Sequence, residues 1–415
     1  MTMIKQLELF KDKDSTVESH SENQQVVGLF AGIGGVELGL QQAGWHSSLM
    51  CEIDPHAKRV LSQNFSISEN EIVSDVKDLR YLPKCGILAA GFPCQDLSQA
   101  GNAAGIGGAR SGLVGEVFRL LKSSTPKWVL LENVPFMLSL DRGRAMQLIT
   151  DKFEELGYRW AYRTINTRSF GIPHRRERVI FIASKTSDPR VPLLNPNAGM
   201  PYIDKDWHKK AIGFYWTEGL RGVGWAIDHV PPIKCGSTVS IPSPPAIWLP
   251  DEIRDKHYRF IKPTIIDAER LQGFPRNWTL HAKYHSRNGD RKRWSLVGNA
   301  VSVPITKWIG ERLLVSESFS EDLESRKKKF NYNSKWPDAA WGSSREDRFT
   351  SIISKWPVKR PKRKLYTFLD DPHACEPLSK RASMGFLKRF SKSNLSAGGA
   401  REKLIEKLNA HIDSL

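Results

Sequence analysis

Short apolar segments alternate with longer amphipathic segments over the first half of the chain. The apolar segments, rich in Val, Ile and Leu, are residues 26–30, 47–54, 72–75, 86–92, 128–134, 162–167 and 178–184. Segments of this length that are apolar at nearly every position are typical of strands buried on both faces of a sheet. Their alternation with helical patterns predicts an α/β fold with a doubly wound, mostly parallel sheet, in which ligands bind at the carboxyl ends of the strands.

The pattern changes after residue 186. Residues 187–262 are dense in Pro, Gly and Trp and have no helical period, which predicts an irregular, turn-rich insert whose tryptophans form mainly a local core. Helical pattern returns in "TIIDAERLQGFP", after "VGNAVSVP" and in the final "AREKLIEKLNAHI". We therefore expect a polar leader, a core domain, the insert and a basic C-terminal extension of unknown role. Their expected bounds are 1–25 for the leader, 26–186 with 263–315 for the core, 187–262 for the insert and 316–415 for the extension.

Charge and cysteine content narrow the class of protein. Lys and Arg number 62 against 45 Asp and Glu, so nucleic acid is the first candidate partner, although solubility or an acidic membrane would also favour a basic surface. The clusters "RKKK" and "KRPKRK" of the extension suggest phosphate contacts, with a solvated surface or a protein partner as equal alternatives. The five cysteines include no CxxC pair, which indicates a reducing, cytoplasmic setting without a metal site or disulfide framework. The chain has no run of 18 apolar residues, so we expect no membrane span.

Candidate binding residues follow the first three predicted strands. "LFAGIGGVELGL" places Gly32 and Gly34 before a helix, where the backbone can approach a ligand closely. It is not the dinucleotide fingerprint, because Glu37 occupies the third glycine position, and such a turn can also serve packing alone. Glu52 ends the second predicted strand and Asp75 the third, where acids can hold ribose hydroxyls and an adenine amine. The pattern favours a cofactor that contains adenosine without phosphate.

Two reactive side chains end the next two predicted strands. Cys94 follows "AAGFP" and Glu132 lies in "LLENVP", so both project from neighbouring strand ends if the strand order is the usual doubly wound one. A thiolate and a carboxyl group in one cleft suit nucleophilic attack with acid assistance. Cys94 could instead be an inert thiol and Glu132 a helix-capping acid, but their convergence with a nucleotide-like site favours catalysis.

Six motifs occur in a characteristic order over residues 26–315. They are "FAGIGG", "GFPCQDLSQAG", "LLENVP", "SFGIPHRRERVIFIA", "ERLQGFP" and "LVGNAV". In order and approximate spacing they resemble the C5-cytosine DNA methyltransferases. The resemblance implies methyl transfer from S-adenosylmethionine to C5 of a cytosine flipped out of double-stranded DNA, through a covalent bond between Cys94 and C6. It also implies that the glycine-rich loop after Cys94 closes over DNA and that the insert reads the target sequence.

The resemblance extends to further site residues. With Cys94 and Glu132, it assigns Arg176 and Arg178 of "HRRER" to the catalytic site, facing the cytosine and its backbone, while His174 stands where glutamine is usual. Phe30 is expected to face the adenine ring, and Asn299 of "GNAV" to help close the cofactor site. The expected cofactor-binding residues are Phe30, Gly32, Ile33, Gly34, Glu52, Asp75, Pro93 and Asn299.

The expected function is therefore that of a monomeric DNA cytosine-5 methyltransferase, the modification arm of a restriction-modification system with a cognate endonuclease encoded separately. A tRNA methyltransferase on the same fold is a second hypothesis, disfavoured by the insert and by the tripeptide PCQ. A catalytically silent DNA-binding protein is a third, disfavoured by the intact Cys94, Glu132 and Arg178.

Overall fold

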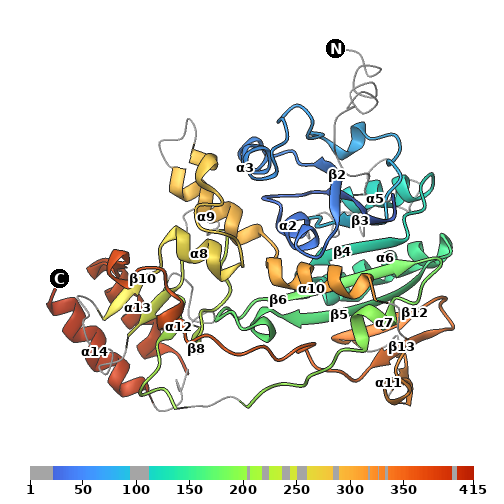
Figure 1. Ribbon diagram of the computed structural model, residues 1–415. Coiled ribbons are helices and arrows are strands. Elements are labelled where there is room, and N and C mark those ends of the chain that lie inside the picture. Colours follow the sequence, from blue (N-terminus) through green and yellow to red (C-terminus); the bar gives the residue numbers. More distant parts are fainter. Residues whose placement is uncertain are drawn as a thin grey trace.

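A nine-stranded mixed sheet forms the larger lobe of the protein, seen here in a computed structural model (Figure 1). Its strand order is β11-β13-β12-β5-β6-β4-β3-β1-β2. The structure describes residues 22–93, 112–202, 206–216, 224–235, 244–249, 259–283, 289–315, 318–325, 327–331, 335–394 and 400–415.

Four parallel strands make up one half of this sheet. They are β2 (His46–Cys51), β1 (Gln25–Leu29), β3 (Ile87–Ala90) and β4 (Trp128–Asn133). Apolar side chains on one face pack against α2 (Gly35–Gln41) and α10 (Val303–Leu313), and those on the other against α5 (Leu113–Leu121) and α6 (Arg144–Glu155). Helices on both faces of parallel strands confirm the predicted doubly wound α/β fold.

The other half of the sheet is antiparallel and includes part of the C-terminal extension. After β4 come β6 (Glu177–Ser184) and β5 (Arg159–Asn166), followed by β12 (Ala339–Gly342), β13 (Arg348–Ser351) and β11 (Lys327–Lys329). The buried guanidinium of Arg348 in β13 pairs with Asp151 and Glu154 of α6. The first part of the extension is thus built into the central sheet.

The prediction of a strand over residues 72–75 is wrong. Val73 makes only an isolated parallel bridge with Cys51 at the end of β2. Asp75 instead accepts the backbone N–H of Lys77 and begins the 3₁₀ helix η2 (Val76–Asp78). A short polar side chain that bonds to its own backbone competes in this way with a strand ladder.

The insert forms a second, five-stranded sheet that the C-terminus completes. Its antiparallel strands are β7 (Ile212–Phe214), β8 (Trp225–Ile227), β9 (Ala246–Trp248) and β10 (Phe260–Lys262), and β14 (Glu376–Pro377) pairs with β10. Helices α13 (Lys380–Lys392) and α14 (Arg401–Asp413) cover this sheet, and Phe386 and Leu404 share a core with Trp207 and Trp248. These elements form the left lobe in Figure 1.

A crossing segment, residues 354–365, runs between the two lobes (Figure 1). The backbone N–H of Arg363 donates to the carbonyl of Gly171, before β6, and that of Leu365 donates to Oδ1 of Asp228, after β8. The crossing segment is therefore bonded to the catalytic lobe and to the insert.

The remaining helices connect these parts. The α-helices are α3 (Pro55–Phe65), α7 (Arg190–Leu194), α8 (Ile265–Leu271), α9 (Gly289–Asn299), α11 (Glu321–Ser325) and α12 (Leu365–Phe368). The other 3₁₀ helices are η1 (Glu22–Gln24), η3 (Pro135–Leu138), η4 (Leu140–Gly143), η5 (Thr167–Phe170), η7 (Leu280–Lys283) and η8 (Pro372–Ala374). Among the described residues, none of the helices has the length and apolar character that a membrane span requires.

Candidate active site

An enclosed ion pair joins two neighbouring strands of the central sheet. Nε of Arg178 lies 2.6 Å from Oε1 of Glu132, and both side chains are nearly buried. The pairing follows from the register: Glu132 of β4 lies opposite Ile180 of β6, and alternate residues of a strand share a face. Burial lowers the pKa of Arg178, and the charge of Glu132 opposes this shift. The pair holds the Glu132 carboxyl group in one orientation.

The polypeptide that leads to Cys94 lies beside this ion pair. A Cβ atom on Gly91 would stand 3.5 Å from Oε2 of Glu132. The side-chain amide of Asn133 donates to the carbonyl of Phe92 at 3.0 Å, which ties the end of β3 to the end of β4. Pro93 is exposed and is the last residue described before Cys94, which with residues 95–111 lies outside the described residues. Glu132, Arg178 and the approach to Cys94 are thus brought together.

Arg176 is buried and serves as a cross-link between segments. Its guanidinium donates to the carbonyl groups of Ile233 in the insert and of Gly298 and Ala300, on either side of Asn299. Burial and the nearby Arg178 lower its pKa. The resemblance predicts that Arg176 faces the cytosine, whereas in the structure its guanidinium donates to backbone carbonyl groups.

His174 is held as a neutral ring beneath the same region. Nδ1 lies 2.9 Å from the carbonyl of Leu271, and the backbone N–H of Ile233 donates to Nε2 at 3.1 Å. Burial, reinforced by Arg176, lowers the pKa of His174 well below its ordinary value. One donor and one acceptor are also what a glutamine amide offers, which explains physically how histidine can occupy this position.

Glu52 forms the centre of the candidate cofactor site. Its carboxylate accepts the backbone N–H groups of Gly32 and Asp54, each at 2.7 Å, and burial raises its pKa. Gly32 has φ of +57°, and a Cβ there would meet no atom within 4 Å. Ile53 is 71% exposed beside it. The adenosine part of a cofactor fits this arrangement. Glu52 has further lone pairs for hydroxyl groups, Gly32 leaves open space and Ile53 offers an apolar contact.

Sequence reasoning did not single out Ile53. The available signal was an apolar residue between two acids, Glu52 and Asp54, at the end of a strand. A single exposed isoleucine is not informative by itself, and its meaning here comes from its place beside Glu52 and Gly32.

Two of the predicted cofactor residues, Gly34 and Ile33, hold the glycine turn against neighbouring parts of the protein. Gly34 has φ of +81°, and a Cβ there would lie 2.5 Å from the ring of Phe65 in α3, so packing alone requires glycine. Ile33 is buried, and its carbonyl accepts the indole N–H of Trp278 at 2.7 Å.

The remaining predicted cofactor residues surround the same strand ends. Asp75 is brought near Glu52 because the backbone N–H of Glu52 donates to the carbonyl of Val73. Phe30 is half-buried at the end of β1, with the strained φ of +58° for a bulky residue. Asn299 is exposed at the end of α9.

Three of the four described thiols, Cys51, Cys85 and Cys375, are poor candidates for a nucleophile, whereas Cys235 is exposed in the insert. Burial raises the pKa of Cys51 and of Cys375 to about 12 and that of Cys85 to about 11. Within the described ranges, no three His, Cys, Asp or Glu residues gather as metal ligands would.

Comparison with known proteins decides the family. Residues 24–212 match the profile of the C-5 cytosine-specific DNA methylases. The chain is 47% identical over 379 residues to "Type II methyltransferase M2.BsuMI" of Bacillus subtilis (strain 168), which spans 89% of this chain and 93% of the relative. The chain belongs to the C-5 cytosine-specific DNA methylase family. It is a DNA cytosine-5 methyltransferase, and this sets aside the tRNA methyltransferase and the silent DNA-binding protein.

A further relative agrees with this membership of the methylase family, and a solved structure shows a weaker likeness. "Type II methyltransferase M.HaeII" of Haemophilus aegyptius is 35% identical over 316 residues, which span 70% of this chain and 93% of the relative. The solved S. pombe Dnmt2 methyltransferase is 18% identical with a TM-score of 0.49, and covers 70% of this chain and 98% of its own. The methylase family implies a DNA substrate and a methyl donor, generally S-adenosylmethionine.

Proposed function

We propose that this methylase modifies C5 of a cytosine within a specific duplex sequence, as the modification arm of a restriction-modification system. The observation that carries the chemistry is the Glu132–Arg178 ion pair beside the approach to Cys94. The biological role is supported by the relatives, which are named Type II methyltransferases.

The proposed chemistry begins with attack on C6, because C5 of cytosine is a poor nucleophile while the ring is aromatic. The Cys94 thiolate adds to C6 of the flipped base. Arg178 occupies Oε1 of Glu132, so Oε2, which lies over Gly91, is left for the base. There it would accept the amino N–H and share a proton with N3, which relieves the charge that builds on the ring as the thiolate adds. S-adenosylmethionine, when bound, supplies the methyl group at C5. Loss of the C5 proton and release of the Cys94 thiolate then restore the aromatic ring.

The proposed cofactor contacts follow from the geometry around Glu52. Its carboxylate would accept the ribose hydroxyls, with Ile53 and Phe30 against the adenine ring and Asp75 near the adenine amine. Gly32 leaves the space that the cofactor needs. Arg176 acts as a positioning residue, since its bonds are to backbone carbonyls around Asn299.

Sequence recognition is proposed for the lobe built around the insert. Strands β7–β10 share one hydrophobic core with α13 and α14, and β14 extends the same sheet. Residues 206–262 and 376–415 therefore act as one unit in the proposed recognition of the DNA sequence.

Bisulfite sequencing of DNA from expressing cells tests this proposal. The wild-type protein should protect cytosine in one sequence context, and Cys94→Ser should protect none while binding S-adenosylmethionine within a few-fold of wild type. Cys235→Ser is the matched control, because Cys235 is an exposed thiol of the insert. Methylation by Cys94→Ser at a rate near wild type would show that the nucleophile is another group.

A second test addresses the covalent step directly. With 5-fluorocytosine at the target, no proton can leave C5, so the protein and the DNA should remain covalently joined. Intact methylation of cytosine without trapping on the fluorinated duplex would contradict addition at C6.

A further inference from the structure

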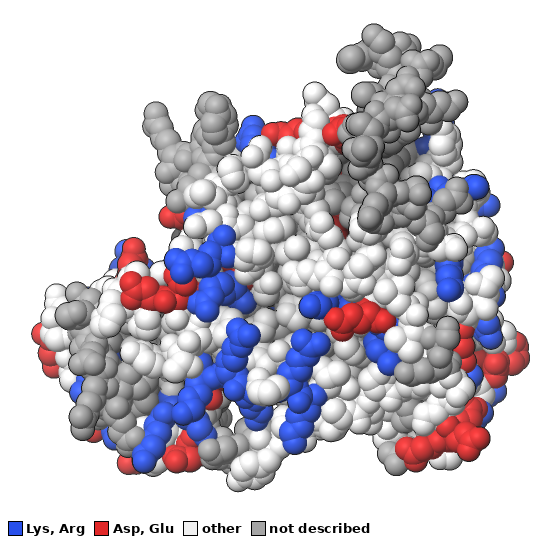
Figure 2. Space-filling model, in the orientation of Figure 1, with Lys and Arg blue, Asp and Glu red and all other residues white. Residues whose placement is uncertain are grey.

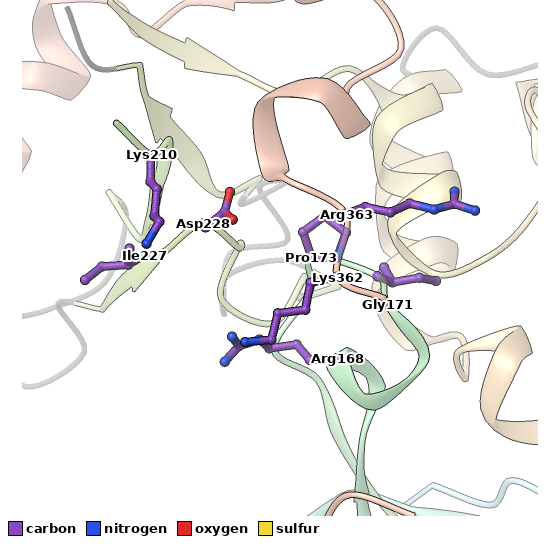
Figure 3. Close-up of a pocket in the computed structure, with 9 residues that line it drawn as sticks. Arg168, Gly171, Pro173, Lys210, Ile227, Asp228, Lys362 and Arg363 are labelled. Atoms are coloured by element: carbon purple, nitrogen blue, oxygen red, sulfur yellow. The ribbon is translucent and has the colours of Figure 1, made fainter. Parts of the chain in front are cut away.

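A cationic pocket lies where three segments distant in sequence meet (Figure 3). Arg168 and the turn at residues 171–173 form one wall, Lys210 and Asp228 of the insert a second, and Lys362 and Arg363 of the crossing segment a third. The cavity has a volume of about 190 Å³. Of its nine lining residues, all of them described, four are Lys or Arg and one is acidic.

The lining of the cationic pocket brings four cations to one acid, and Lys362 also donates to the carbonyl of Tyr202. Asp228 uses Oδ1 to accept the backbone N–H of Leu365 at 2.8 Å, and burial raises its pKa, which weakens it as a counter-charge. Burial also lowers the pKa of Lys362, and Arg168 lowers it further. An anion that enters beside Lys362 would favour the charged form of its ammonium group.

Two further cavities share lining residues with the cationic pocket. A cavity of about 540 Å³ shares Arg168 with it and adds Arg175. Arg363 also borders a cavity of about 310 Å³, where Arg270 pairs with Asp370 and Lys307 with Glu311. Figure 2 shows Lys and Arg side chains gathered where the two lobes meet. The excess of positive charge therefore lies in the cationic pocket itself, where it suits a phosphate group.

The cationic pocket is also close along the chain to the active site. Pro173 lines it, and Arg178, five residues later, pairs with Glu132. Five residues reach at most about 18 Å when fully extended. A duplex with its cytosine at Glu132 has backbone phosphates within that distance.

We propose that the cationic pocket binds a backbone phosphate of the substrate DNA beside the target base. The proposal rests on the proposed function in that it takes duplex DNA as the substrate. It gives part of the C-terminal extension a role in holding DNA without reading its sequence, because phosphate contacts position a protein but carry no base information.

The test is the salt dependence of DNA binding by a double variant, Lys210→Gln with Lys362→Gln. The slope of log affinity against log salt should become shallower by about 0.9 for each phosphate that the variant no longer neutralises, while the methylated sequence stays the same. The matched control is Lys122→Gln with Lys127→Gln, which removes two exposed charges between α5 and the amino end of β4. Lys210→Arg with Lys362→Arg should keep the wild-type slope.

Each outcome decides the proposal. A slope change no larger than that of the control overturns it. Weaker binding of inorganic phosphate with a wild-type DNA slope also overturns it, since the pocket would then serve a free anion. If thermal unfolding shows that the double variant is unfolded, the single variant Lys362→Gln gives the same comparison. Wild-type protein that methylates no cytosine would instead refute the proposed function.

Discussion

Glu132 and Arg178 depend on each other, because each is almost enclosed by protein. Glu132→Gln keeps the shape of the side chain but leaves the charge of Arg178 unpaired. We expect the methylation rate to fall by about 10²- to 10⁴-fold, the range for removal of an acid-base group, and the free energy of unfolding by about 3–5 kcal/mol. Single-turnover methylation and urea unfolding measure the two effects.

Glu177→Gln is the control for this change. Glu177 precedes Arg178 and points to the other face of β6, where it pairs at 2.9 Å with Lys355, and both side chains are about one third exposed. A partly solvated pair contributes about 1 kcal/mol or less, so we expect a near wild-type rate. Equal effects of the two variants would mean that Glu132 has only a structural role.

His174 makes the stability of the folded protein sensitive to acid. In the folded state its pKa is lowered well below 6.5, and that of the buried His229 is lowered to about 3. Below about pH 6.5 the unfolded chain binds more protons than the folded one. The free energy of unfolding should then fall as pH falls, by up to about 1.4 kcal/mol per pH unit for each ring, and for His229 down to about pH 3.

Two variants separate the charge of His174 from its hydrogen bonds. His174→Gln should retain neutral-pH stability and show a shallower loss on acidification, by up to one proton, when urea unfolding is compared between about pH 6.5 and pH 5. His174→Leu leaves the N–H of Ile233 and the carbonyl of Leu271 unpaired, which should cost about 1–3 kcal/mol at neutral pH. An unchanged pH slope in His174→Gln would contradict the assigned neutral state.

At the scale of elements, the approach of the crossing segment to the turn before β6 depends on one glycine. Gly171 has φ of +86°, and a Cβ there would lie 2.5 Å from the carbonyl oxygen of Pro361. Gly171→Ala therefore adds a clash to the strain of a left-handed alanine, which is about 1–2 kcal/mol. We expect it to destabilise the protein by clearly more than that strain alone, as measured by urea unfolding.

Gly157→Ala is the control, because Gly157 has φ of +77° with no atom within 4 Å of an added Cβ. It should cost only the strain. If the two variants are equally stable, the crossing segment is not held against this turn.

At the scale of the whole molecule, we expect the methylated DNA sequence to change only when residues 206–262 and 376–415 are exchanged together. We expect a chimera that receives residues 206–262 and 376–415 of a relative to methylate the relative's sequence, because the central sheet still supplies Glu132 and Arg178. An exchange of 206–262 alone should give insoluble protein, since α13 and α14 would then face a foreign core. Bisulfite sequencing and the soluble fraction measure these outcomes. An active double exchange that still methylates the original sequence would place recognition elsewhere.

The sequence alone determined the parallel half of the fold and the place of Glu132 at a strand end. Segments such as "ILAA" and "WVLL" are apolar at every position, and only a sheet covered on both faces can bury them. Glu132 comes directly after "WVLL", near the end of its strand. The prediction of a strand at residues 72–75 was wrong because Ile72 and Val73 are apolar, as in a strand, whereas the Asp75 carboxylate accepts the backbone N–H of Lys77.

Only the tertiary structure decided what the long-range contacts do. Nothing in the residues around Arg176 indicates that its guanidinium donates to carbonyls more than 50 residues away. Nor does the local sequence indicate that the neutral His174 lies between Leu271 and Ile233. The same holds for the C-terminal extension, whose charge suggested a basic surface segment, but whose strands complete two sheets. Hydrophobic periodicity and local hydrogen bonds depend on a few neighbouring residues. The partner of a strand edge or of a buried charge depends instead on how the whole chain packs.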